Sequence, residues 1–219
     1  MRRAFAVGIR RVLPGAGMRR AGIGLVALLL AVTGPLPTAH ADEGALPGIA
    51  VAPQHHRYDY RRAAFGKAWE NGGDCDTRDE ILDRDLIDKT YVSVRRCPDA
   101  VATGVLDDPY TGTVISFQRG PKTGEDVQID HIVPLAYAWD MGASEWTDAQ
   151  RKQFANDPDE LLAVQGKANE DKGDSPPGNW MPPNAAFDCQ YATHWVTVLR
   201  KYGLPIDPAS VPVVRRSCP

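Results

Sequence analysis

A run of six residues, IDHIVP at Ile129–Pro134, constrains this chain more than any other stretch. Its apolar residues predict a strand over 127–133 that ends near the proline, because proline cannot donate a hydrogen bond to a sheet. A second apolar run at Leu161–Val164 predicts another strand, and residues 166–172 predict a short helix directly after it. Two strands followed by a helix bring the end of the first strand against the helix. Polar side chains at these two places can therefore share one site.

Three polar residues lie at those two places. Asp130 and His131 end the first strand, and Asn169 lies on the helix. His131 is the candidate general base, because imidazole has the ordinary pKa closest to neutral pH. Asp130 is the candidate metal ligand and Asn169 offers a second oxygen, since hard cations such as Mg²⁺ prefer oxygen. Taken singly each residue is more often structural, and only the joint pattern indicates phosphodiester hydrolysis.

Two cations are candidates for contact with a substrate phosphate. Lys172 follows Asn169 by three residues and lies on the same side of the predicted helix. Arg78 lies near the start of an earlier predicted helix, among several aspartates. The alternative for Lys172 is a solvated lysine at a helix end, which the helix dipole favours. The alternative for Arg78 is a structural ion pair with a neighbouring aspartate.

With these residues the chain resembles the HNH endonuclease family, in a branch of secreted proteins, over about Tyr60–Gly203. The resemblance implies a ββα-metal core in which Asp130 is the metal ligand, His131 the general base and Asn169 the second ligand. It also implies metal-dependent cleavage of DNA, or alternatively RNA, with little sequence preference. Nucleic acid would then be a transient partner. Mg²⁺ is the expected metal, with Mn²⁺ or Zn²⁺ as alternatives.

The chain departs from the family at Glu160, where the family usually has an asparagine before the second strand. A carboxylate accepts hydrogen bonds but cannot donate them as an amide does. Glu160 is therefore a catalytic candidate that accepts from His131 Nδ1 and orients the ring, or a residue that accepts from backbone. The alternative is that Glu160 misplaces the loop. The chain would then be a secreted, non-catalytic binding module that retains the nuclease fold.

The N-terminal 41 residues predict a signal peptide. Six arginines precede an apolar run at 22–32, and Ala39-His40-Ala41 has the small-x-small pattern of a cleavage site. The apolar run is short for a membrane span, which disfavours an uncleaved anchor. We expect a secreted protein without stable membrane association, with a flexible leader over 42–58 and a single HNH nuclease domain over 59–219. Met1 and Met18 are both candidate start residues, and the sequence does not choose between them.

Four cysteines follow the predicted signal peptide: Cys75, Cys97, Cys189 and Cys218. An even number in an oxidising compartment predicts two disulfides, with three pairings available. We favour Cys75–Cys97 and Cys189–Cys218, because both close short loops. A metal held by cysteines is disfavoured because no C-x-x-C pair is present.

Composition limits the kind of nucleic-acid contact. Without its first 41 residues the chain has 19 Lys and Arg against 28 Asp and Glu, a formal charge of −9. This argues against a tight, sequence-specific binder but leaves room for brief contact through a metal and a local cation.

Helices are also expected over 60–70, from a capping box at Thr77, from a second one at Thr147, and from Asn184 to Gly203. The fold class predicted is α+β, with a ββα-metal core, additional helices, a small antiparallel sheet and two disulfides.

Overall fold

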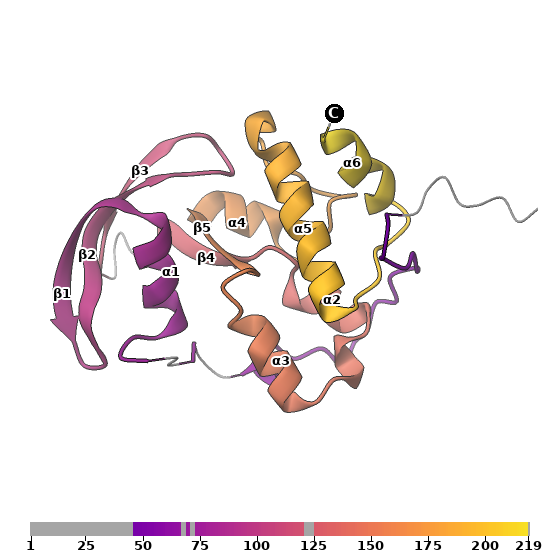
Figure 1. Cartoon of the computed structure of the whole chain (residues 1–219), viewed down its shortest axis with the longest axis horizontal. Helices are drawn as coiled ribbons and strands as arrows, with labels where there is room; N and C mark the ends of the chain where they lie inside the picture. Colours follow the sequence, from indigo (N-terminus) through magenta and orange to yellow (C-terminus); the bar gives the residue numbers. More distant parts are fainter. Residues whose placement is uncertain (1–45, 67–68, 71–72, 121–124, 219) are drawn as a thin grey trace, which may run out of the picture. The chain divides into compact units, whose positions relative to one another are not determined.

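The computed structural model describes residues 46–66, 69–70, 73–120 and 125–218, all within one compact unit that spans 41–219. The predicted signal peptide and both start methionines lie outside these residues. The described helices are η1 (Arg62–Phe65), α1 (Thr77–Asp85), α2 (Leu135–Asp140), η2 (Ala143–Glu145), α3 (Asp148–Ala155), α4 (Gly166–Lys172), η3 (Ala185–Phe187), α5 (Asp188–Tyr202) and α6 (Ser210–Ser217). The described strands are β1 (Ile87–Val94), β2 (Cys97–Asp107), β3 (Val114–Gln118), β4 (Val127–His131) and β5 (Leu161–Gln165). This mixture confirms the predicted α+β class (Figure 1).

Two small antiparallel sheets both pack against helix α1. Three strands pair in the order β1-β2-β3, and β4 pairs with β5. Ile81 and Leu82 of α1 are buried in one cluster with side chains from β2, β3, β4 and β5. Figure 1 shows α1 beside the β1–β2 hairpin, and the shared cluster places it against the second sheet as well. Because its apolar face contacts both sheets, α1 fixes one relative to the other.

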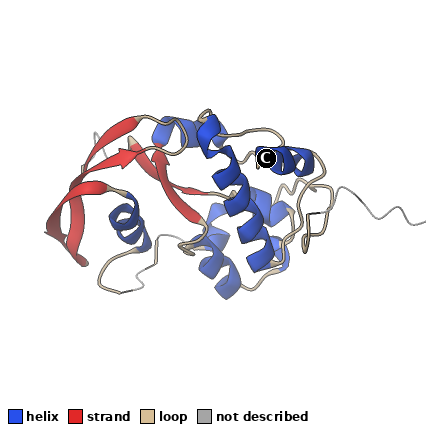
Figure 2. Ribbon diagram, turned by 45° about the horizontal axis from the view of Figure 1, so that its top comes forward, coloured by secondary structure: helices blue, strands red, loops and turns tan. Residues whose placement is uncertain are grey.

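A larger core lies among α2, α3, α5 and α6, which gather away from the three-stranded sheet (Figure 2). β5 separates the two cores, since side chains of a strand alternate between its faces. Leu161 and Ala163 belong to the α1 cluster, whereas Leu162 and Val164 contact the larger core. No helix in the described ranges has the length and apolar character needed to cross a membrane.

The two predicted capping boxes have different outcomes. At α3, Thr147 Oγ1 accepts from Gln150 N at 3.3 Å and the Gln150 side chain accepts from Thr147 N at 2.9 Å, as predicted. The capping box predicted at Thr77 is wrong. Asp76 is the N-cap of α1 and accepts from Asp79 N at 3.0 Å. A carboxylate one residue earlier takes that amide, so Thr77 becomes the first helical residue and its hydroxyl makes other contacts.

Part of the predicted flexible leader lies against the folded unit instead. Ile49 is 6% exposed, and Ile206 exchanges backbone hydrogen bonds with Ala50 and Ala52 at 2.9 and 3.0 Å. Leu46, Ile49 and Ala52 of this segment therefore pack on the larger core, whereas Val51 is exposed. Of the helix predicted over 60–70, the residues that the structure describes form only the single turn of η1.

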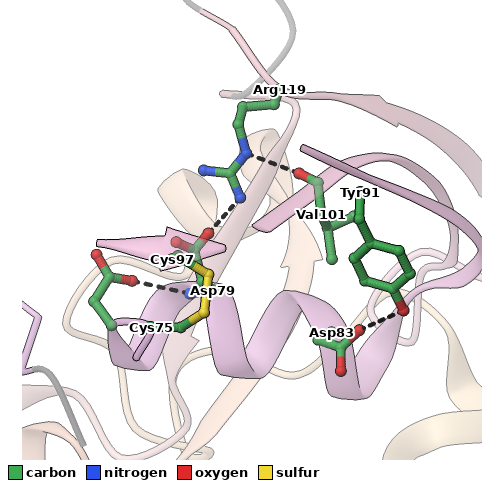
Figure 3. The surroundings of a disulfide bond; sticks show 8 residues. Cys75, Asp79, Asp83, Tyr91, Cys97, Val101 and Arg119 are labelled. Carbon is green, nitrogen blue, oxygen red and sulfur yellow. Dashed lines mark hydrogen bonds and ion pairs between the residues drawn. A yellow bond between two sulfur atoms is a disulfide. The ribbon is translucent and has the colours of Figure 1, made fainter. Parts of the chain in front are cut away.

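Both favoured disulfides are present, Cys75–Cys97 and Cys189–Cys218. The first ties the chain before α1 to the start of β2. Figure 3 shows it near the ion pair between Asp79 and Arg119. The second joins the start of α5 to the end of α6, two helices that pack together. Each bond therefore stabilises a junction between neighbouring elements.

Candidate active site

A hairpin and the helix that follows it build the site. β4 and β5 are antiparallel, with His131 opposite Leu161 and Val127 opposite Gln165. α4 begins at Gly166, immediately after β5, and contacts both strands. Only glycine fits at this close approach, because a Cβ atom there would lie 2.2 Å from the Glu125 carbonyl oxygen. The tight junction lets α4 lie directly beside the strand that carries Asp-His.

A pocket of about 160 Å³ lies between the end of β4 and α4. Asp130, His131 and Asn169 all line it, so folding brings the three residues predicted from the sequence together. Tyr60 and Arg62 from the segment around η1 line it too. The remaining lining residues are Ile129, Pro134, Leu135, Gly173 and Asp174. No motif in the sequence marks Arg62 as part of a site, because only the tertiary fold brings it there.

The His131 ring is held at one edge and on one face. Its Nε2 lies 3.0 Å from the carbonyl oxygen of Ala155, the last residue of α3. A carbonyl oxygen only accepts, so Nε2 carries the proton and Nδ1 carries the lone pair. The Trp69 ring stacks on the imidazole, with 5.5 Å between the ring centroids and 10° between the planes. These contacts leave Nδ1 in the form that a general base requires.

Burial keeps this imidazole uncharged. Loss of water lowers the pKa of His131 to about 3, although the hydrogen bond to Ala155 acts in the opposite direction. The positive charges of Arg62 and Lys172 lower the pKa further. His131 is therefore neutral across the range of pH in which most proteins work.

Asp130 lies below the pocket surface and is only 5% exposed. The Tyr110 hydroxyl donates to Oδ2 at 2.5 Å, and the Lys172 ammonium donates to Oδ1 at 2.8 Å. Burial raises the pKa of Asp130, whereas Lys172 and Tyr110 lower it. The His131 backbone amide also donates to this carboxylate and lowers its pKa. The two oxygens have four lone pairs in all, so three donors leave one for a further partner.

The structure corrects both predictions of phosphate contact. Lys172 has no exposed side-chain surface, and its ammonium donates to Asp130 Oδ1 and the His131 carbonyl oxygen, both at 2.8 Å. It is a buried counter-ion and not a solvated lysine. Arg78 is half-buried on α1 and donates to the Val127 carbonyl oxygen at 3.3 Å, at the opposite end of β4 from His131. Neither cation lines the pocket.

Glu160 acts on the loop behind His131 and not on its ring. Its fully buried carboxylate accepts from Val133 N, at 3.1 Å to the nearer oxygen. Its backbone carbonyl accepts from Ile132 N at 2.9 Å. Of the two roles expected from the sequence, the structure shows the backbone contact. The ring proton of His131 lies on Nε2, where it bonds to Ala155, so Nδ1 has no proton to donate to Glu160. Burial raises the pKa of Glu160 well above its ordinary value, with the Val133 amide acting against this.

The donors in the pocket suit a hard divalent cation. The Asn169 amide nitrogen donates to Gln128 Oε1 at 2.8 Å, which leaves its carbonyl oxygen for a metal. Together with Asp130 this gives two oxygen ligands, a number typical of Mg²⁺ sites completed by water and phosphate. In the parts of the chain described, no three His, Cys, Asp or Glu side chains are grouped to hold a metal. The two oxygens of Asp130 and Asn169 are donors of the kind that hard divalent cations bind.

The fold and pocket thus define an α+β domain in which a β-hairpin and a helix bring Asp, His and Asn together. Residues 76–206 match the family described as GmrSD restriction endonucleases, C-terminal domain. The chain belongs to this nuclease-type family. It is also 36% identical over 177 residues to an uncharacterized secreted protein of Arthroderma benhamiae, covering 80% of this chain and 81% of that protein. No solved structure matches the chain.

Proposed function

We propose that this protein is a metal-dependent endonuclease of the HNH type. It hydrolyses phosphodiester bonds in DNA with little sequence preference, and RNA is the second candidate substrate. The observation that carries the proposal is the common pocket of Asp130, His131 and Asn169, in which the His131 ring is oriented with Nδ1 unprotonated. Membership of a family of restriction-endonuclease domains supports nucleic acid as the substrate.

His131 is the proposed general base. Its Nδ1 takes a proton from a water molecule, whose oxygen attacks the phosphorus. Glu160 keeps the loop behind His131 in place through Val133 N, and so acts as a positioning residue. A divalent cation held by Asp130 and Asn169 would supply positive charge for the phosphate oxygens and the leaving oxygen. Mg²⁺ is the expected ion, because both protein ligands are oxygens.

Arg62 is the proposed contact for the substrate phosphate, in place of Lys172 and Arg78. It is exposed, it lines the pocket, and its hydrogen bond to the Gly66 carbonyl oxygen is long at 3.4 Å. A guanidinium group offers paired N–H donors that match the oxygens of a phosphate. Because the chain is acidic outside its first 41 residues, one local cation gives brief and salt-sensitive binding.

We further propose that the protein acts outside the cell that makes it. The similar protein of Arthroderma benhamiae is named a secreted protein, and the two disulfides suit an oxidising compartment. The arginine-rich, apolar N-terminal sequence supports export by a cleaved signal peptide.

The decisive experiment is plasmid cleavage by the oxidised chain from Asp42 onward, with Mg²⁺, Mn²⁺ or EDTA. His131→Ala is compared with His194→Ala, which removes an exposed histidine of α5. We expect cleavage that needs metal, is lost in His131→Ala and persists in His194→Ala. A folded protein that cleaves neither DNA nor RNA with any metal would overturn the proposal and favour the binding module.

A further inference from the structure

The residues that hold the His131 ring come from outside the β4–β5–α4 unit, and the inference here rests on the proposed role of that ring. Trp69, on the ring face, precedes α1 in the chain. Ala155, at Nε2, is the last residue of α3. The hairpin itself fixes neither segment. A side chain that ties the two segments together therefore controls where the ring lies.

Asn156 makes this connection. Its backbone directly follows Ala155, and its side-chain Oδ1 accepts from Glu70 N at 2.9 Å. Glu70 directly follows Trp69, so this hydrogen bond fixes the backbone next to the stacked ring. The same oxygen accepts from Thr77 Oγ1 at 3.0 Å, which attaches the first residue of α1 to the same point. One amide therefore links α3, the Trp69 segment and α1.

The contacts around Asn156 use both ends of its amide. Its Nδ2 donates to the Lys152 carbonyl oxygen at 2.9 Å, one helical turn earlier, which orients the amide plane. The Lys152 ammonium pairs with the Glu70 carboxylate at 2.7 Å, and Thr77 N donates to the Glu70 carbonyl oxygen at 2.8 Å. Aspartate at this position would keep the acceptor but lose the donor, and would add a negative charge near Glu70.

We propose that Asn156 is a positioning residue for His131, acting through Trp69 on the ring face and through the Ala155 carbonyl at Nε2. The first contact fixes the plane of the ring and the second fixes its tautomer. A ring that can rotate presents Nδ1 to the substrate water in only some of its orientations. Misplacement of a reacting group by about 1 Å can cost about a hundredfold in rate. Asn156 itself touches neither substrate nor metal in this role.

The test compares Asn156→Ala and Asn156→Asp with Gln153→Ala, which removes an exposed amide from the same helix. With Mg²⁺ and a DNA substrate, Asn156→Ala should lose about tenfold to a hundredfold in kcat, with KM changed by less than about twofold. Asn156→Asp should lose less, because it keeps the acceptor for Glu70 N and Thr77 Oγ1 and loses only the donor to Lys152. Gln153→Ala should match the wild type. Ring nitrogen NMR shifts of His131 should show the proton on Nε2 in the wild type and a mixture of tautomers in Asn156→Ala.

A second pair of variants keeps the proposal testable if Asn156→Ala does not fold. Trp69→Ala should lower kcat and mix the His131 tautomers in the same way, whereas Trp69→Phe should recover most of the loss because it keeps an aromatic face. Unchanged kcat and unchanged ring nitrogen shifts in the folded variants would overturn the positioning role. Altered tautomers in a protein that cleaves nothing would support the positioning role while removing the nuclease proposal, so the two failures are distinguishable.

Discussion

Replacement of Lys172 by methionine tests whether this lysine is a buried counter-ion or a phosphate contact. Methionine keeps an unbranched side chain of similar length but removes the charge. Lys172 has no exposed side-chain surface and donates to Asp130 and to the His131 carbonyl oxygen. The substitution leaves the Asp130 carboxylate buried with Tyr110 as its remaining hydrogen-bond donor from a side chain. Breaking a buried ion pair in this way costs about 3–5 kcal/mol.

Urea unfolding of the oxidised chain measures this loss directly. Lys172→Met should lower the free energy of unfolding by about 3–5 kcal/mol. The matched control is Lys167→Met on the same helix, where an exposed ion pair with Asp171 contributes less than about 1 kcal/mol. The double variant with Asp130→Asn should regain part of the loss, because no uncompensated charge then remains buried.

The result that refutes this reasoning is a small change. If the free energy of unfolding of Lys172→Met lies within about 0.5 kcal/mol of the wild-type value, as for most surface substitutions, the lysine is not a buried counter-ion. If the free energy of unfolding is unaltered while KM for DNA rises, the result supports the phosphate contact that the sequence predicted for Lys172.

Three further predictions follow from the same structure. The first concerns Glu160, whose pKa is raised in the folded state. As pH rises above 4.5, the unfolded chain loses the Glu160 proton while the folded chain retains it. The free energy of unfolding therefore falls with rising pH until the folded pKa is passed. Urea unfolding from pH 4.5 to 8 should show a steeper fall for wild type than for Glu160→Gln, and parallel curves would contradict this. Ring proton NMR of His131 should show no titration between pH 8 and 5, because its pKa is about 3, and a midpoint near 6.5 would exclude a desolvated base. Alanine at both Cys75 and Cys97 should lower the free energy of unfolding by about 3 kcal/mol for the 22-residue loop, and a loss under about 1 kcal/mol would argue against this role.

Local patterns predicted the core of the site well. The strands predicted over 127–133 and 161–164 are present over 127–131 and 161–165, and the helix predicted over 166–172 has those bounds. Gly173 ends the helix with a positive φ of 52°, a conformation that glycine adopts readily. Asp130, His131 and Asn169 share a pocket because the order of these elements leaves few other arrangements.

Tertiary contacts decided what the sequence could not predict. Lys172 and Asn169 are three residues apart on one helix, yet only packing on β4 determines that the lysine is buried and the amide lines the pocket. Trp69 and Arg62 reach the site from a distant segment without a motif. Helix α6 (SVPVVRRS) was missed because its proline and valines disfavour a helix locally, whereas packing on α5 stabilises it.

The Cys75–Cys97 bridge has a consequence for the timing of activity. In the chain Cys75 lies between Glu70 and Thr77, which both donate to the Asn156 amide oxygen, and the bridge attaches Cys75 to the start of β2. A chain still inside a reducing compartment lacks the bond, so the segment that carries Trp69 is less firmly held. Under the proposed function, a newly made chain would be a poor nuclease while it shares a compartment with the genome of its own cell. Oxidation on export would then complete the catalytic pocket at the place where cleavage does no harm to the producer.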